Sequence, residues 1–131
     1  MKNVLYGKCV RCGRTYEATP DLTTCECGGI LDITYDYDYI RTQLTKEKLA
    51  ARTDRSMWRY RELLPIEETT ENTPLRVGNS PLYEEPRLAE MLGLKRLYVK
   101  DDGQNPTASL KDRASAMAVA KAREAGAKII A

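Results

Sequence analysis

Four cysteines form two short motifs whose spacing is typical of a metal site. They are Cys9, Cys12, Cys25 and Cys27. Glycine follows each motif and allows the tight turn that brings backbone amides toward the sulfur atoms. Four thiolates from two such motifs predict a tetrahedral Zn²⁺ site. A complete set of four cysteine ligands leaves no open position for catalysis, so the metal would be structural.

Two other states of these cysteines are chemically feasible. The four thiols could form two disulfides, or they could stay unpaired and buried. A reducing compartment disfavours the disulfides, and the paired spacing disfavours four independent thiols. The second motif has one residue between its cysteines instead of the commoner two, so we expect a tighter geometry around Cys25 and Cys27.

A lysine at an expected helix start is the second feature that could do chemistry. Within NPTASLKDRAS, residues 105–115, Ser109 and Asp112 are spaced as a helix N-cap and its reciprocal partner. This interpretation places Lys111 in the first helical turn, near the positive end of the helix dipole and close to Arg113. Both effects, with burial, favour the neutral amine that Schiff-base chemistry requires. The alternative is an ordinary solvated surface lysine.

The overall composition excludes several classes of function. The chain of 131 residues has no His, which rules out His metal ligands and a serine–histidine triad. Its 21 basic and 19 acidic residues nearly balance, so there is no electrostatic case for binding nucleic acid or an anionic membrane. No apolar run approaches the roughly 20 residues needed to cross a bilayer, and the apolar core of a signal peptide is missing. We therefore expect a cytoplasmic protein.

The pattern of apolar, turn and capping residues predicts a mixed α/β chain. Thr45 and Ser56 are the expected N-caps of two helices in the central part. A long, alanine-rich helix, suited to close packing on a sheet, should extend from Ser109 to Gly126. A further helix is expected within residues 84–94, with Pro86 in its first turn and Gly93 after its end. Strands are expected at 6–10, 14–18, 30–36, 73–77, 95–100 and 128–131.

The segment around the lysine closely resembles that of a known family. VKDDGQNPTASLKDRAS, residues 99–115, is similar to the cofactor-lysine segment of threonine synthases, which are fold-type II pyridoxal-phosphate (PLP) enzymes. The order of NTPL, a helix ending in LGL and a strand carrying YVKDD agrees with that family. The upstream segment WRYRELLP is also similar, and many members carry an N-terminal Cys₄ ribbon that ends in a comparable CGG motif.

The resemblance implies an activity and a division of the chain. Lys111 would hold PLP as a Schiff base and move protons while O-phospho-L-homoserine and water become L-threonine and phosphate. The implied organisation is an N-terminal zinc ribbon (1–40), a helical connector (41–72) and a truncated fold-type II PLP-enzyme α/β domain (73–131). We also expect a homo-oligomer, because strands without their full packing partners expose edges that pair with another chain.

The sequence departs from the family pattern in two respects. Ala108 and Leu110 stand where Gly and Phe are often found, and both changes look tolerable. The family's asparagine-bearing loop beside the PLP ring and its glycine-rich phosphate-binding loop do not occur before Ala131. We therefore expect the 131-residue chain alone to be inactive.

Rival functions stay open at this point. Cysteate synthase, which acts on phosphoserine with sulfite, resembles threonine synthase and is the nearest enzyme alternative. A threonine dehydratase-like activity agrees less well with the ribbon. The alternative from another class is a non-enzymatic zinc module that serves in contacts or assembly. An absorbance spectrum with added PLP separates the two classes, because a Schiff base with lysine absorbs visible light.

Overall fold

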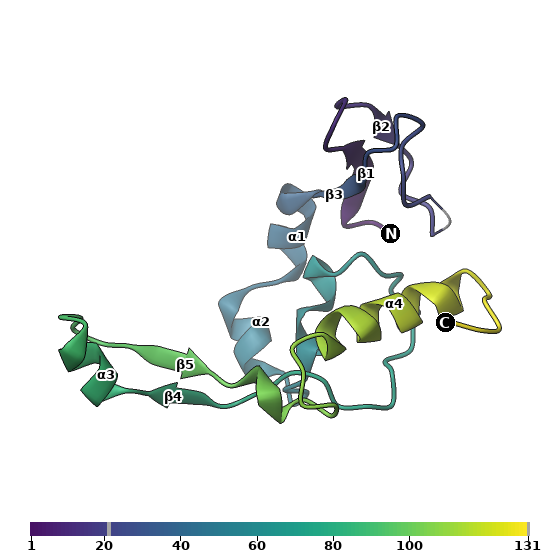
Figure 1. Ribbon diagram of the computed structural model, residues 1–131. Helices are drawn as coiled ribbons and strands as arrows, with labels where there is room; N and C mark the ends of the chain where they lie inside the picture. The colour runs from purple at the N-terminus through teal and green to yellow at the C-terminus, as the bar shows by residue number, and fades with distance from the viewer. Residues whose placement is uncertain (21, 131) are drawn as a thin grey trace.

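The computed structural model describes residues 1–20 and 22–130. Its N-terminal part is a three-stranded antiparallel sheet in the order β2-β1-β3, at the top of Figure 1. The strands are β1 (Val4–Cys9), β2 (Thr15–Tyr16) and β3 (Leu31–Tyr35). β1 lies between the other two, with Cys9 opposite Leu31. The three strands predicted for this region are confirmed.

A helical segment follows the sheet. It contains α1 (Tyr37–Gln43), α2 (Lys46–Ala51) and the 3₁₀-helix η1 (Met57–Leu63). The Thr45 side chain accepts a hydrogen bond from the Lys48 amide (3.2 Å). The Ser56 side chain accepts one from the Trp58 amide (3.3 Å), so both predicted N-caps are confirmed. The helix after Ser56 is 3₁₀ with a kink at Tyr60 (φ −108°, ψ 28°).

The C-terminal part combines an antiparallel strand pair with the longest helix of the described residues. Its elements are β4 (Leu82–Glu84), α3 (Pro86–Met91), β5 (Tyr98–Lys100), the 3₁₀ turn η2 (Asp102–Gln104) and α4 (Asp112–Glu124). β4 and β5 pair with Tyr83 opposite Val99, and α3 joins them. Together they form an arm, residues 82–100, that projects from the molecule in Figure 1. Pro86 starts α3 and Gly93 follows its end with φ +67°, as predicted.

The arm leaves a set of apolar side chains exposed. Leu88, Met91 and Leu92 of its helical end are 42%, 82% and 60% exposed. Leu82 and Val99 on the strands are also exposed. Several large apolar side chains are therefore exposed on one short arm of the molecule.

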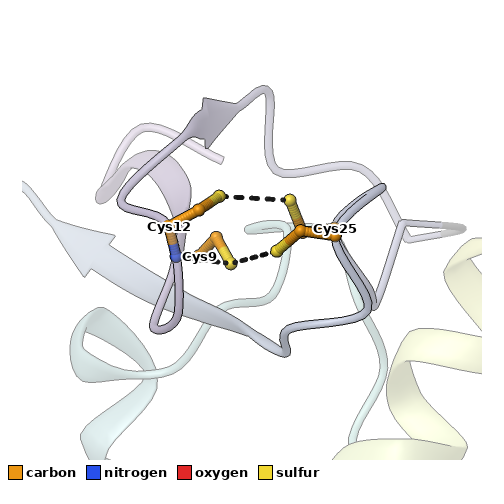
Figure 2. Close-up of side chains that lie close together, drawn as sticks. Cys9, Cys12 and Cys25 are labelled. Carbon is orange, nitrogen blue, oxygen red and sulfur yellow. Dashed lines mark hydrogen bonds between the residues drawn. The ribbon is translucent and has the colours of Figure 1, made fainter.

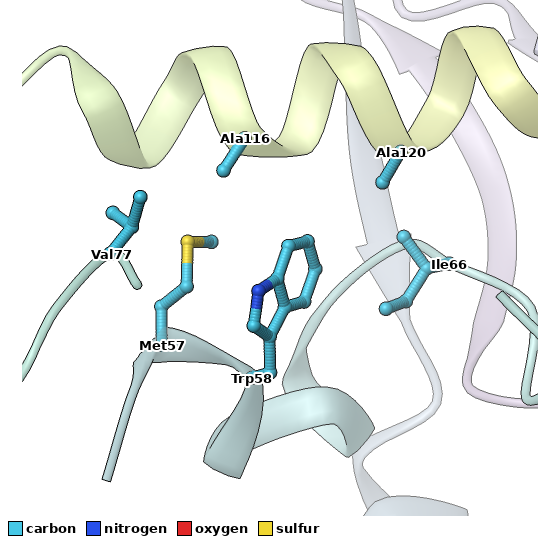
Figure 3. Packing of buried hydrophobic residues seen from close by; sticks show 6 residues of the cluster. All are labelled: Met57, Trp58, Ile66, Val77, Ala116 and Ala120. Atoms are coloured by element: carbon cyan, nitrogen blue, oxygen red, sulfur yellow. The ribbon is translucent and has the colours of Figure 1, made fainter. Parts of the chain in front are cut away.

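The hydrophobic core lies between η1 and α4. Its six buried members, labelled in Figure 3, are Met57, Trp58, Ile66, Val77, Ala116 and Ala120. Trp58 is 3% exposed and Ala120 is fully buried, because the small alanine side chains let the indole lie close to the helix. The alanine-rich face of α4 therefore packs on η1, and not on a sheet as the sequence suggested.

The predictions of strands at 73–77 and 128–131 are wrong. Residues 73–77 and 128–130 have no strand, and Ala131 lies outside the described residues. The Val77 carbonyl accepts a hydrogen bond from the Met57 amide (2.8 Å), so this backbone pairs with the start of η1. Strand β4 was not predicted, because its three residues gain strand structure only by pairing with β5.

Candidate functional sites: a four-cysteine centre and the Lys111 turn

The four cysteines converge at the end of the N-terminal sheet (Figure 2). Their Sγ atoms all lie within 4.8 Å of one another. The Sγ atoms of Cys9 and Cys27 are 3.6 Å apart. Those of Cys12 and Cys25 are also separated by 3.6 Å. The structure therefore brings together all four cysteines that the sequence singled out, and none of them is in a disulfide.

Three glycines shape the turns that carry the sulfur atoms. Gly13 and Gly28 have φ values of +76° and +78°, in the left-handed region that favours glycine. Gly29 is needed for space, since a Cβ atom there would lie 2.6 Å from the Cys9 Sγ and 2.9 Å from the Arg11 Cβ. The sequence indicated turn glycines, and the structure adds a packing reason for the second glycine of the CGG motif.

Hydrogen bonds stabilise the two buried thiolates. The Cys12 and Arg11 amides donate to the Cys9 Sγ (3.5 and 3.4 Å) and lower the pKa of the Cys9 thiol, although burial opposes them. The Tyr16 hydroxyl lies 3.0 Å from the Cys25 Sγ and is the main cause that lowers the pKa of Cys25 to about 6. Tyr16 was not singled out in the sequence, because its place opposite the second motif depends on the pairing of β2 with β1.

The sulfur atoms cannot all be charged without a cation. The Gly29 amide lowers the pKa of the Cys27 thiol, but the three neighbouring sulfurs outweigh it and raise that pKa to about 12. A tetrahedral ion with metal–sulfur bonds of about 2.3 Å needs sulfur–sulfur separations of about 3.8 Å. The Cys9–Cys27 and Cys12–Cys25 pairs, at 3.6 Å, suit such an ion. The donor set therefore fits a tetrahedral, thiolate-binding metal.

Lys111 lies on an exposed turn immediately before α4. Its backbone is helical (φ −65°, ψ −19°), and its amide donates to the Ser109 hydroxyl (3.2 Å). The predicted helix start at Ser109 is wrong, because α4 begins at Asp112. The Lys111 side chain is exposed, so burial does not add to the effects that favour its neutral amine. Within residues 1–20 and 22–130 its amine has no hydrogen-bond or ion-pair partner, so it is open to a ligand.

The Asp112 side chain closes the turn by binding Thr107, and not Ser109 as a reciprocal cap would. Its carboxylate accepts hydrogen bonds from the Thr107 amide (2.8 Å) and from the Thr107 hydroxyl. The residue is only 8% exposed. Between these two residues Ala108 has φ +56°, a left-handed conformation that is strained for an L-residue with a side chain. The turn that carries Lys111 is therefore compact and conformationally restricted.

Asn105 ties this turn to a distant segment. It is 6% exposed, and its Oδ1 accepts a hydrogen bond from the Gly78 amide (2.9 Å). Its Nδ2 donates to the Asp102 carbonyl (2.9 Å). Gly78 has φ +91°, and a Cβ atom there would lie 2.8 Å from the Met57 nitrogen. The approach of these segments therefore requires glycine at position 78.

An ion pair holds the start of α4 to both ends of the arm. Arg113 donates through Nε and Nη2 to the two carboxylate oxygens of Asp102, each at 2.8 Å. The Ser80 hydroxyl donates to the same carboxylate and accepts from Arg113 (3.3 Å). Arg113, and to a lesser degree Ser80, hold the pKa of Asp102 well below its usual range. Ser80 and Asp102 were missed in the sequence, because only the folded arm brings them together.

The chain is similar to one family of enzymes and to several known proteins. Residues 73–131, which include the Lys111 turn, match the family described as pyridoxal-phosphate dependent enzyme. The chain is 42% identical over 123 residues to threonine synthase of Methanocaldococcus jannaschii. This match covers 94% of the present chain and 30% of the threonine synthase. It is also 42% identical over 125 residues to threonine synthase of Methanosarcina acetivorans, with 95% and 30% covered. Cysteate synthase of the latter organism is 30% identical over 132 residues, with 94% and 28% covered.

The chain spans about 30% of the length of the threonine synthases that it matches. The family resemblance seen in residues 99–115 is confirmed by these matches, and so is the mixed α/β class. No solved structure matches at a significant level. In the part of the chain that the structure describes, no helix has the length and apolar character to cross a membrane.

Proposed function

We propose that this chain is part of a threonine synthase. Residues 73–131, which match the pyridoxal-phosphate dependent enzyme family, support this proposal. The reaction is the conversion of O-phospho-L-homoserine and water to L-threonine and phosphate. The 42% identity to two threonine synthases across nearly the whole chain carries the proposal. An enzyme of this kind would work in the cytoplasm, where a reducing environment also keeps the four thiols available.

Lys111 is the residue that we assign to the cofactor. Its exposed amine, unpaired within the described residues, suits a Schiff base with the aldehyde of PLP. When bound, PLP supplies an electron sink for negative charge at the Cα atom of the substrate. Lys111 carries protons to and from Cα and Cβ of the substrate. The contact between Asp112 and Thr107 holds the lysine backbone in place.

We assign the four cysteines to one structural Zn²⁺. Their Sγ atoms lie within 4.8 Å of one another and form a complete tetrahedral set, so no position is open for substrate or water. The ion would therefore contribute to folding and not to the reaction. In this assignment residues 1–40 are the zinc ribbon, residues 41–72 are the connector, and residues 73–131 are part of the PLP-binding domain.

Borohydride reduction tests the assignment of the lysine. Protein expressed from its complete open reading frame is incubated with PLP, reduced, digested and mapped by mass spectrometry. The pyridoxyl group is expected on Lys111 and absent from Lys111→Ala. Lys100→Ala and Lys121→Ala are matched controls that should keep the label, because these amines are bound to the Ser80 carbonyl and the Glu124 carboxylate. Labelling of another lysine contradicts the assignment.

Cysteate synthase is the second candidate, because it matches the same 94% of the chain at 30% identity. The same protein should release phosphate from O-phospho-L-homoserine and form L-threonine. Phosphate release only from phosphoserine in the presence of sulfite would identify a cysteate synthase. Stoichiometric zinc with no visible absorbance after PLP addition, and no turnover of either substrate, would identify a non-enzymatic zinc module.

A further inference from the structure

We propose that Tyr16 donates a hydrogen bond to the metal-bound thiolate of Cys25 and so raises the affinity of the cysteine centre for its ion. This inference rests on the proposed zinc site and adds a residue that is not itself a ligand. The Tyr16 hydroxyl lies 3.0 Å from the Cys25 Sγ. Cys25 is buried and Tyr16 is half-buried. The hydroxyl therefore contacts the ligand sulfur directly.

The surroundings of Tyr16 decide which atom donates. A metal-bound thiolate has no hydrogen, so the Cys25 sulfur can only accept. The guanidinium of Arg14 is a charged neighbour of the Tyr16 hydroxyl. A guanidinium has no acceptor atom, so it does not compete with Cys25 for the hydroxyl hydrogen.

The fold places both Tyr16 and Arg14 beside the second cysteine motif. Arg14 pairs with the carboxylate of Glu26, the residue between the two cysteines of the second motif. Tyr16 belongs to β2, where it lies opposite Gly7 of β1. Strand pairing therefore fixes the tyrosine backbone, and an exposed ion pair links Arg14 to the second motif.

The Tyr16 hydroxyl gives Cys25 a partner of a different kind from those of Cys9. Cys9 accepts from two backbone amides, at 3.4 and 3.5 Å, while Cys25 accepts at 3.0 Å from a side chain. Four thiolates around Zn²⁺ carry a net charge of −2, and hydrogen bonds to sulfur spread this charge and orient the ligands. Loss of such an outer partner typically lowers metal affinity by about 10–100-fold.

Tyr16→Phe tests the inference, because it keeps the ring and removes only the hydroxyl. We expect the Zn²⁺ affinity, measured by competition with a chromogenic chelator, to fall by about 10-fold or more. The sulfur-to-metal charge-transfer band of the Co²⁺ form should shift, because one thiolate has lost its hydrogen bond. Tyr6→Phe on strand β1 removes a hydroxyl that does not contact the cysteines, and it should leave both measurements unchanged.

The possible outcomes separate this inference from the zinc site itself. Equal affinity and identical Co²⁺ spectra for wild type and Tyr16→Phe overturn the role of Tyr16 and leave the zinc site intact. A wild-type chain that binds no Zn²⁺ overturns the zinc site, and this inference with it. If Tyr16→Phe does not fold, Arg14→Gln replaces it, since the glutamine amide oxygen offers the hydroxyl hydrogen a competing acceptor. A smaller loss of affinity with a band shift supports the hydrogen bond to Cys25, and no change in either overturns it.

Discussion

The cysteine centre and the Lys111 turn are built in different ways. The cysteine centre is local, since its glycines, its amides and the Tyr16 hydroxyl all come from residues 9–29. The Lys111 turn depends on distant residues, because Asn105 binds a residue 27 positions away and Arg113 binds one 33 positions away. Figure 1 shows the sheet at the top and the start of α4 near the base of the arm. A local centre can form when its ion binds, whereas the turn needs most of the C-terminal half to fold first.

Loss of the metal should unfold the sheet and leave the core between η1 and α4 in place. Cys9→Ser removes one ligand, and structural Zn²⁺ contributes about 10–16 kcal/mol of apparent binding energy to small modules. We expect zinc to fall from about one per chain to none, and amide protons of β1 to exchange rapidly. The fluorescence of Trp58, the single Trp of the chain, should stay unchanged.

The matched control for this prediction is Val10→Ser, an exposed residue of the same turn, which should keep its zinc. A Cys9→Ser protein that is as stable and as zinc-loaded as the wild type would show that the four cysteines do not hold a structural metal.

Overpacking the core should destabilise the core and leave the metal site intact. The loss of stability should be smaller than that caused by loss of the metal. Ala120 is fully buried beneath the connector, so Ala120→Leu should lower the free energy of unfolding by about 1–3 kcal/mol. Ala118→Leu, on the exposed side of the same helix, should be nearly neutral. Urea unfolding followed by Trp58 fluorescence measures both, and the zinc content should not change. Equal stability of the two variants would contradict the packing of α4 on η1.

The ion pair at the base of the arm predicts a dependence on acid. The pKa of Asp102 is lowered in the folded protein by Arg113, so its carboxylate stabilises the fold above the ordinary value of 3.8. That stabilisation is lost as the pH falls below 3.8 through the lower folded value. Wild type should therefore be more stable than Asp102→Asn at neutral pH, and the difference should shrink in acid.

Asp38→Asn is the control for the acid experiment, because its partner Arg41 and the carboxylate are both largely exposed. Its stability difference from wild type should be small at every pH. Unfolding free energies measured along the acid series decide the prediction, and a difference between wild type and Asp102→Asn that does not vary with pH would rule out this role of the pair.

Relief of backbone strain should give a small gain in stability. Ala108 has φ +56°, where an L-residue is disfavoured by about 1–2 kcal/mol. Ala108→Gly removes this strain but makes the unfolded chain more flexible, so we expect a net gain of a few tenths to about 1 kcal/mol. Ala114→Gly, within α4, should instead lose about 0.5–1 kcal/mol. Thermal unfolding of the two variants should shift in opposite directions, and a loss for Ala108→Gly would be inconsistent with a strained turn.

Short-range rules predicted the cysteine centre and several helix ends. The cysteine spacing and the caps Thr45 and Ser56 each act within a few residues, so they can be recognised without the tertiary structure. The same holds for Pro86 and Gly93 around α3. The resemblance of residues 99–115 agrees with the family that residues 73–131 match, but it did not predict the conformation of that segment.

Long-range partners could not be predicted in this way. Residues 73–77 have the composition of a strand, yet the backbone of Val77 pairs with Met57 because η1 and α4 enclose its side chain in the core. Asp112 has the spacing of a reciprocal cap, but Thr107 is nearer once the turn bends at Ala108. Tertiary contacts overrode the local preference in both segments.

The ion pair at the base of the arm gives the arm a mechanical property. Ser80 lies just before the arm and Asp102 just after it, and both bind Arg113, which is two residues beyond Lys111. Paired strands with both ends anchored to one guanidinium form a lever whose pivot is at the start of α4. A displacement of the far tip, at α3, would therefore act through this pivot on the turn that carries Lys111.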